Sequence, residues 1–421
     1  MKVLIKQARI IDPASSEQDR EQDIFIESGI IKSIGSNIEL KADRIISGNG
    51  IHVSPGWVDV FANFCDPGYE HKETLESGTA AAAAGGFTDV FVVPNTKPVI
   101  DNKSQVEYLK NRSLSHPSNV HPIGAISKNA EGKDLAEMYD MLHSGAIAFS
   151  DGTNPIQSAG LLVKALQYVK AFNGVIIQIP DDKTIGTNGL MHEGITSTRL
   201  GLAGKPIMAE ELLVARDIKL TRYTESKLHF TGITSPRSLE YIKRAKDSGL
   251  NVTCSVTPYH LFFTDENLQD YDTNLKVYPP LRSDWQRLEL LKAVENGTVD
   301  CIATHHMPQD YDSKVVEFEY AKNGMIGLQT CYAVLKNVLP NVSETRWVEL
   351  LSTNARKIFA MDCPAVKEKE KAVLTIFQPG EEVDIKQSDN KSKSANSPFM
   401  GRKMKGKVLG IINGEKLSLN Q

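Results

Sequence analysis

The chain has 421 residues, of which 41% are hydrophobic and 24% charged, as in a soluble globular protein with one large and one smaller domain. Its formal net charge of −4 excludes a general affinity for nucleic acid or anionic membranes. The five cysteines are an odd number without a CxxC pair, which favours reduced thiols in a cytoplasmic protein over a disulfide framework. No stretch approaches the ~20 apolar residues of a bilayer-spanning helix, so we expect no membrane anchor.

Short strands are predicted first, over residues 1–53. From residue 57 onward, apolar runs alternate with amphipathic segments that have the spacing of helices. The apolar runs cover 57–64, 88–94, 120–126, 146–151, 175–179, 227–233, 251–256 and 299–304. Strands that alternate with helices form parallel βαβ units, and eight such units in about 250 residues are typical of a (β/α)8 barrel. An open doubly wound sheet is the alternative, although no GxGxxG follows the first strand to support a dinucleotide site.

The two ends of the chain have a different pattern from the middle. Residues 373–421 again contain short strands, such as VLTIFQP and VLGIINGEKL. We therefore predict an α/β protein with two domains: residues 55–363 form the (β/α)8 TIM barrel, and residues 1–54 plus 364–421 form a small composite β-sandwich. The basic stretch 390–407 is interpreted as a solvated loop in preference to a binding patch.

The reacting groups of such a barrel lie at the carboxyl ends of its strands. Side chains alternate along a strand, so Asp59, Phe61 and Asn63 share one face of the first strand. The eighth strand ends in His305 and His306, which point to opposite faces and cannot easily bind one ion. Zinc requires several converging imidazole, thiolate or carboxylate ligands. Together with Asp151 after the fourth strand, these residues offer few ligands for a metal-activated water.

Several sequence blocks, in order and over nearly the whole length, resemble the dihydroorotase family of the amidohydrolase superfamily. They are PGWVDV, HKETLESGTAAAAAGGFTDV, VPNTKPVIDN, GAIAFSD, MHEGITSTRLGLAGKP, SVTPYHL, NLKVYPPLR, NGMIGLQT and SPFMGRKMKGKVL. The resemblance implies a barrel of the metallo-dependent hydrolase type, zinc, and the cyclisation of carbamoyl aspartate to dihydroorotate in pyrimidine biosynthesis. It also implies that Asp151 occupies the metal-bridging position and that Asn95 contacts substrate.

The catalytic positions of the family are mostly replaced in this chain. Histidines of the family fall on Phe61, Asn63, Ile179, Gly232 and Gln309, its substrate-binding arginine on Cys65, its catalytic aspartate on His305, and an asparagine on Tyr278. Loss of four imidazoles removes most metal ligands, and Cys65 cannot form the bidentate clamp that arginine makes with a carboxylate. We therefore expect no catalytic residue and no metal cofactor. Phe61 and Ile179 are interpreted as apolar filling of the barrel mouth, and Asn95 as a brace between loops.

The leading hypothesis is a catalytically inactive dihydroorotase homologue, a pseudoenzyme that acts as a structural or regulatory partner of aspartate carbamoyltransferase. The resemblance also implies a homodimer. One alternative is an active cyclic-amide hydrolase with a displaced metal site formed by Asp151, His305 and His306. Another is a metal-free small-molecule binding module in which Asn95 and Tyr278 contact a pyrimidine-like ring.

Overall fold

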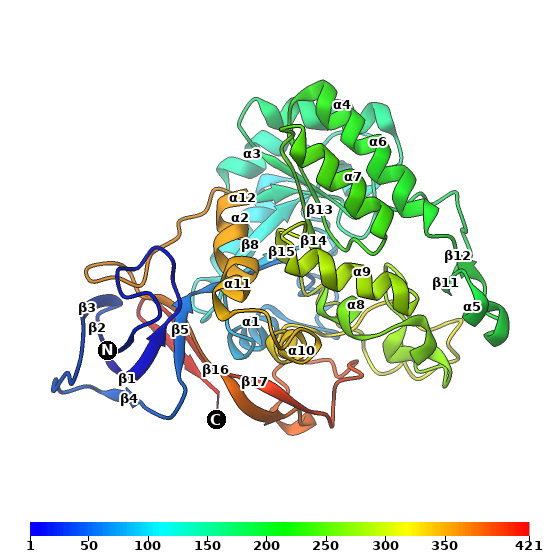
Figure 1. Ribbon diagram of the computed structural model, residues 1–421. Coiled ribbons are helices and arrows are strands. Elements are labelled where there is room, and N and C mark those ends of the chain that lie inside the picture. Colours follow the sequence, from blue (N-terminus) through cyan, green and yellow to red (C-terminus); the bar gives the residue numbers. More distant parts are fainter. Residues whose placement is uncertain (421) are drawn as a thin grey trace.

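Eight parallel strands form a nearly closed barrel in the middle of the chain (Figure 1). The computed structural model describes residues 1–420. The first and last strands meet through a parallel bridge between Ala62 and His306, and the amide of Asn63 donates to the carbonyl of His306 at 2.8 Å. In pairing order the strands are β6 (Trp57–Ala62), β7 (Phe87–Val92), β8 (Asn119–Gly124), β9 (Ala148–Phe149), β10 (Val175–Gln178), β13 (Lys227–Phe230), β14 (Val252–Val256) and β15 (Cys301–Ile302).

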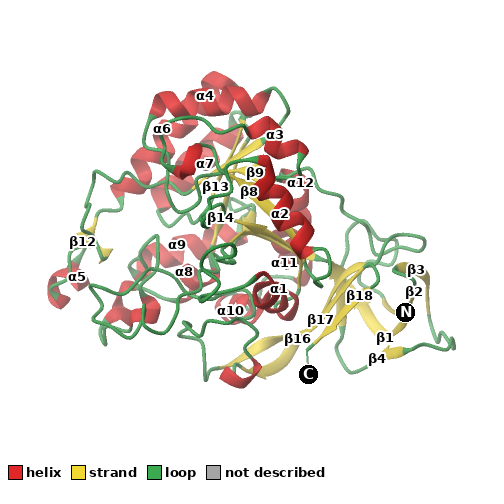
Figure 2. Ribbon diagram, turned by 180° about the vertical axis from the view of Figure 1, so that it is seen from behind, coloured by secondary structure: helices red, strands yellow, loops and turns green. Residues whose placement is uncertain are grey.

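The barrel strands are apolar because both of their faces are covered. Every residue of β6, β7 and β10 is buried, as expected for parallel strands between an inner core and an outer layer of helices. Figure 2 shows helices packed outside the strands. They are α1 (Leu75–Ala84), α2 (Lys103–Ser113), α3 (Met138–His143), α4 (Ala159–Lys170), α6 (Met208–Thr224), α7 (Pro236–Asp247), α8 (Pro258–Phe262), α9 (Asp284–Glu295), α10 (Cys331–Val338), α11 (Glu344–Val348) and α12 (Asn354–Ile358).

Helix starts follow local capping chemistry. Thr74 caps α1 in a capping box with Ser77, and Ser235 caps α7, which has Pro236 in its first turn. These caps fix the residue at which each helix begins, and they thereby set the length of the loop that precedes it at the barrel mouth.

Strands from the two ends of the chain form one mixed sheet beside the barrel, with both termini next to it (Figure 1). Its pairing order is β18-β17-β16-β5-β1-β2-β3, with β4 paired to β1. The strands are β1 (Lys2–Ile10), β2 (Glu21–Glu27), β3 (Ile30–Gly35), β4 (Arg44–Ile46), β5 (His52–Pro55), β16 (Val373–Asp384), β17 (Lys403–Asn413) and β18 (Lys416–Leu419). The predicted fold class, a (β/α)8 TIM barrel with a small composite β-sandwich, is confirmed in the barrel and in a β part built from both ends of the chain, which forms one mixed sheet. The domain limits at residues 54 and 364 stay predictions.

One excursion leaves the barrel between β10 and β13. It contains β11 (Met191–His192), α5 (Ile195–Leu200) and β12 (Gly204–Lys205), and it projects from the body of the molecule (Figure 1). Within residues 1–420, no helix combines the length and the hydropathy that crossing a bilayer requires.

The interpretation of residues 390–407 as a solvated loop is wrong. Ser392, Ser394 and Asn396 are buried, and residues from 403 onward belong to β17. Ser394 donates to the carbonyl of Lys72 at 2.7 Å, and Asn396 donates to the carbonyl of Met307 at 3.1 Å. We call residues 390–399 the strap, because this segment crosses the loops that follow β6 and β15. The polar side chains of Ser394 and Asn396 are thus buried because they bond to the backbone of these loops.

Candidate site at the barrel mouth

The centre of the barrel mouth is filled by apolar side chains. Phe61 at the end of β6 and Ile179 after β10 are buried in one hydrophobic cluster. The ring of Phe61 also packs against the imidazole of His305, with 4.6 Å between ring centroids. Neither Phe61 nor Ile179 has a side-chain atom that could bind a metal.

Gly232 and His305 occupy the space of one side chain. Gly232 follows β13 in the left-handed region, with φ of 71°, and a Cβ built on it would lie 2.7 Å from Cε1 of His305. Real Cβ contacts are essentially never that short. The imidazole of His305 therefore lies where a side chain at residue 232 would begin, so a histidine here requires glycine at residue 232.

A chain of hydroxyl groups holds the His305 imidazole. Its Nε2 lies 2.8 Å from Oγ1 of Thr231, which accepts from Ser255 at 2.8 Å, and Ser255 is 3.1 Å from Nε2 of His229. Burial lowers the pKa of His305 to about 3, and the neighbouring His260 and His229 add to this effect. His305 is therefore neutral at physiological pH and is held by a hydroxyl group.

Asn63 and Cys65 are hydrogen-bonded to each other within the loop that follows β6. The Asn63 side chain accepts from the amide of Cys65 at 2.8 Å, and Cys65 has a positive φ of 57°. Burial raises the pKa of the Cys65 thiol to about 12. A neutral, buried thiol neither clamps a carboxylate nor acts as a nucleophile at neutral pH.

Asp151 and His306 make separate contacts with other parts of the barrel. Asp151 accepts hydrogen bonds from the amide of Ser127, at 2.9 Å, and from the hydroxyl of the same residue. Burial raises the pKa of Asp151 to about 6. His306 Nε2 lies 3.2 Å from the buried carboxylate of Glu73, and its Nδ1 accepts from the amide of Gly327.

The residues present do not fit a zinc centre. Across residues 1–420, no three His, Cys, Asp or Glu side chains converge in a way that could hold a metal ion. In particular, the structure does not bring Asp151, His305 and His306 together into the displaced site of the first alternative. Three positions that the resemblance assigns to histidines of the family are Phe61, Ile179 and Gly232. None of the three has a side-chain atom that could bind zinc.

Asn95 and Gln309 connect loops. Asn95 donates to the carbonyl of Asp151 at 3.1 Å and accepts from the amide of Thr153 at 3.0 Å. The Gln309 side chain accepts from Lys72 Nζ at 2.8 Å and donates to the carbonyl of Asn323 at 2.8 Å. In both residues, the oxygen and the nitrogen of the side-chain amide are each hydrogen-bonded.

A cavity of about 500 Å³ lies above the filled centre. Asn63, Ile179 and Gln309 contribute to its wall, as does Tyr278. The hydroxyl of Tyr278 donates to Asp181 at 2.7 Å, and the other carboxylate oxygen of Asp181 pairs with Lys205 at 2.9 Å. Asp181 and Lys205 were not predicted from the sequence. Asp181 stands two residues after Ile179, and Lys205 lies in the block MHEGITSTRLGLAGKP. Asp181 is already paired, so the wall of the cavity is nearly neutral there.

Glu73 is a second group that sequence reasoning missed. It is fully buried and bonds to His306, to Ser77, and to the hydroxyl of Ser392 and the amide of Lys393 in the strap. Burial opposes its charged form, but the bonds to His306 and Ser392 outweigh that effect, so the pKa of Glu73 lies below its usual value. His306 lies 233 residues away in sequence and the strap lies further still, so no local pattern could have indicated these partners.

A nearly closed parallel barrel with a mixed sheet built from both termini, and with its candidate site at the strand ends, defines an amidohydrolase-type barrel. Among solved structures, the L-hydantoinase (dihydropyrimidinase) of Arthrobacter aurescens is similar, with a TM-score of 0.87 at 22% identity over 99% of this chain and 96% of that one. At that identity the likeness concerns the fold.

Sequence comparison then gives the family. Residues 50–238 match the model of the Dihydro-orotase-like family. The dihydroorotase of Acetivibrio thermocellus is 39% identical over 98% of this chain and 98% of its own length. That of Geotalea daltonii is 39% identical over 99% of both. The chain belongs to the dihydroorotase family. Members typically bind zinc, and in this chain the residues at the mouth do not fit that ion.

Proposed function

We propose that this protein is a dihydroorotase homologue without the metal-dependent cyclisation reaction, and that it serves pyrimidine biosynthesis as a structural or regulatory partner of aspartate carbamoyltransferase. One observation carries the first half of the proposal: the positions of the metal ligands form a packed, neutral core. Phe61 stacks on His305, and His305 fills the space that a side chain at Gly232 would need.

The partner follows from the family resemblance together with the preserved fold. An intact barrel with a repacked mouth keeps its outer surfaces, and those surfaces are what a binding partner contacts. Aspartate carbamoyltransferase makes carbamoyl aspartate, the compound that dihydroorotases cyclise, so it is the enzyme of the preceding step.

The test combines zinc analysis of the purified protein with the cyclisation assay. The dihydroorotase of Acetivibrio thermocellus, prepared in the same way, is the control. We expect substoichiometric zinc and no formation of dihydroorotate from this chain. Near-stoichiometric zinc together with turnover would overturn the loss of chemistry. For the second half, the tagged chain should retain the carbamoyltransferase of the same cell on an affinity column, and its elution in the unbound fraction would refute the partnership.

The second candidate is an active dihydroorotase or related cyclic-amide hydrolase. The names of the relatives favour it, since proteins 37–39% identical over nearly their whole length are dihydroorotases. This candidate uses the displaced metal site of Asp151, His305 and His306, so turnover and bound zinc that are lost both on chelation and in His305→Ala would support it. Absence of turnover at any zinc concentration would count against it.

A third candidate is a metal-free binding module, which the 500 Å³ cavity at the mouth favours. Tyr278 lines this cavity, whereas Asn95 is committed to Asp151 and Thr153. Thermal shift with dihydroorotate and carbamoyl aspartate tests it. Stabilisation that is reduced in Tyr278→Phe would support this candidate, and an unchanged melting temperature at millimolar ligand would leave it without support.

A further inference from the structure

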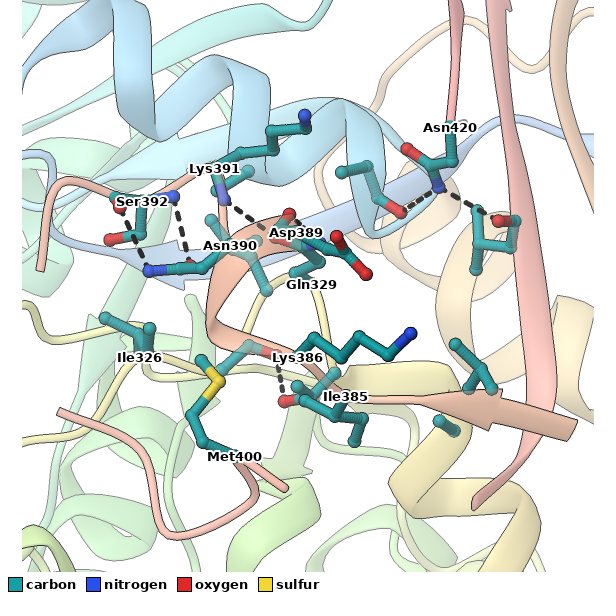
Figure 3. A pocket seen from close by; sticks show the side chains of 18 of the residues that line it. Ile326, Gln329, Ile385, Lys386, Asp389, Asn390, Lys391, Ser392, Met400 and Asn420 are labelled. Carbon is teal, nitrogen blue, oxygen red and sulfur yellow. Dashed lines mark hydrogen bonds between the residues drawn. The ribbon is translucent and has the colours of Figure 1, made fainter. Parts of the chain in front are cut away.

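A second cavity, of about 190 Å³, lies on the side of the barrel, where it meets the mixed sheet (Figure 3). It is bounded by α1, by the start of α10, by β16 and β17, and by the beginning of the strap. It reaches the buried His306 but lies apart from the mouth cavity, with which it shares no lining residue.

The floor of this cavity is apolar. The apolar lining residues, which we call the floor, include Ala84, Leu328, Ala333, Ile385, Met400 and Val408. Apolar cavities of about 150 Å³ take up benzene from water, so this volume suits one six-membered ring or a short aliphatic chain. The small side chains of Ala84 and Ala333 leave that room.

The charges at the rim are mainly positive. Lys386, Lys391 and Lys407 all line the cavity, and within residues 1–420 none of their ammonium groups has a carboxylate within 4.0 Å. Two acidic residues also line it, and one of them, Asp384, is 3.8 Å from Lys403. Three lysines therefore line the cavity against two aspartates, Asp384 and Asp389, a balance that favours an anion by charge complementarity.

The walls are held in place before any ligand arrives. The Gln329 side chain donates to the carbonyl of Asp389 at 2.8 Å and accepts from the amide of Lys391 at 3.0 Å. At another edge, Asn420 donates to the carbonyls of Ala84 and Val408 at 2.8 and 2.9 Å, and so connects α1 to β17 (Figure 3). A preformed wall avoids the ordering cost of binding.

We infer that this cavity binds a small amphipathic anion, consisting of a single ring or short chain in the apolar floor and a carboxylate or phosphate at the lysine rim. The inference is independent of the proposed function, because the mouth of the barrel contributes none of these groups. It defines a second ligand site in a chain whose family site is repacked.

Ligand-observed nuclear magnetic resonance with four probes of one ring size tests the inference: benzoate, phenyl phosphate, benzyl alcohol and benzylamine. We expect saturable binding of one or both anions, weaker binding of the alcohol and none of the amine. The two anions separate a carboxylate ligand from a phosphate ligand. Absence of anion binding at millimolar concentration would overturn the inference, as would equal binding of alcohol and anion.

Variants then place the bound anion. Ala84→Leu fills the floor and should abolish binding, and Lys407→Gln should weaken it by about fivefold, the effect of one exposed charge pair. The matched control is Lys405→Gln, an exposed lysine of the same strand that does not line the cavity; it should bind as the wild type does. If Ala84→Leu does not fold, the exposed pair Lys386→Gln and Lys391→Gln decides, since unchanged affinity in the double variant overturns the inference.

Discussion

Substituting Gly232 with alanine measures how tightly His305 fills the space that a side chain at residue 232 would need. The new Cβ would lie 2.7 Å from Cε1 of His305 and 3.3 Å from Cδ of Pro279. Neither neighbour can move freely, because His305 and Pro279 are both buried and His305 is also hydrogen-bonded to Thr231. The substitution therefore adds a methyl group to a site that has no room for it.

The expected cost has two parts. A non-glycine residue in the left-handed conformation costs about 1–2 kcal/mol, and overpacking a filled core costs about 1–3 kcal/mol. Gly232→Ala should thus lower the free energy of unfolding by roughly 2–5 kcal/mol. In a His305→Ala background the ring is absent and only the backbone part remains. The coupling between the two substitutions should be about 1–3 kcal/mol.

Urea denaturation of the wild type, both single variants and the double variant gives this coupling directly. Gly249→Ala is the matched control, since Gly249 has a φ of 80° and no atom lies within 4 Å of the Cβ that this substitution adds. It should cost only the backbone part and add independently to His305→Ala. Equal costs of Gly232→Ala in the two backgrounds would refute the claim that His305 occupies the space that a side chain at residue 232 would need.

Three further predictions concern buried ionisable groups. Glu73→Gln should cost about 1–3 kcal/mol and expose the strap to limited proteolysis, and the stability that Glu73 provides should disappear below pH 4.5, because its folded-state pKa is lowered. Burial raises the pKa of Asp59 to about 7, so stability should fall as pH rises from 4 to 7, and Asp59→Asn should flatten that fall in urea titrations. Burial lowers the pKa of Lys314 to about 7, so stability should rise between pH 7 and 10, and Lys314→Met should remove that part of the slope. An unchanged slope would contradict the effect of burying an amine that bonds to the carbonyls of Thr273 and Lys276.

The barrel could be predicted because each of its strands is marked locally. The runs at 57–64 and 175–179 are largely apolar, since strands covered on both faces need no alternation. The sequence also indicated that the substituted positions lie together at the carboxyl ends of the strands. Phe61 and Ile179 share one cluster, and His305 contacts the position of Gly232.

What the sequence could not indicate are the partners that the remaining polar residues take. His306 pairs with Glu73, 233 residues earlier, and the strap reaches the same carboxylate through Ser392. Hydrogen bonds between residues so far apart in the chain leave no periodic pattern in the sequence. The composition of the strap favours a solvated loop because serine and lysine are typical of exposed segments, whereas its serines are buried against loop backbone.

The zinc content of the purified protein, measured after expression in zinc-supplemented medium and gel filtration, tests the central claim most directly. A mouth filled by Phe61, Ile179 and the Gly232–His305 contact predicts substoichiometric zinc and a melting temperature that a chelator does not change. Near-stoichiometric zinc that a chelator removes, with a fall in melting temperature, would contradict the account.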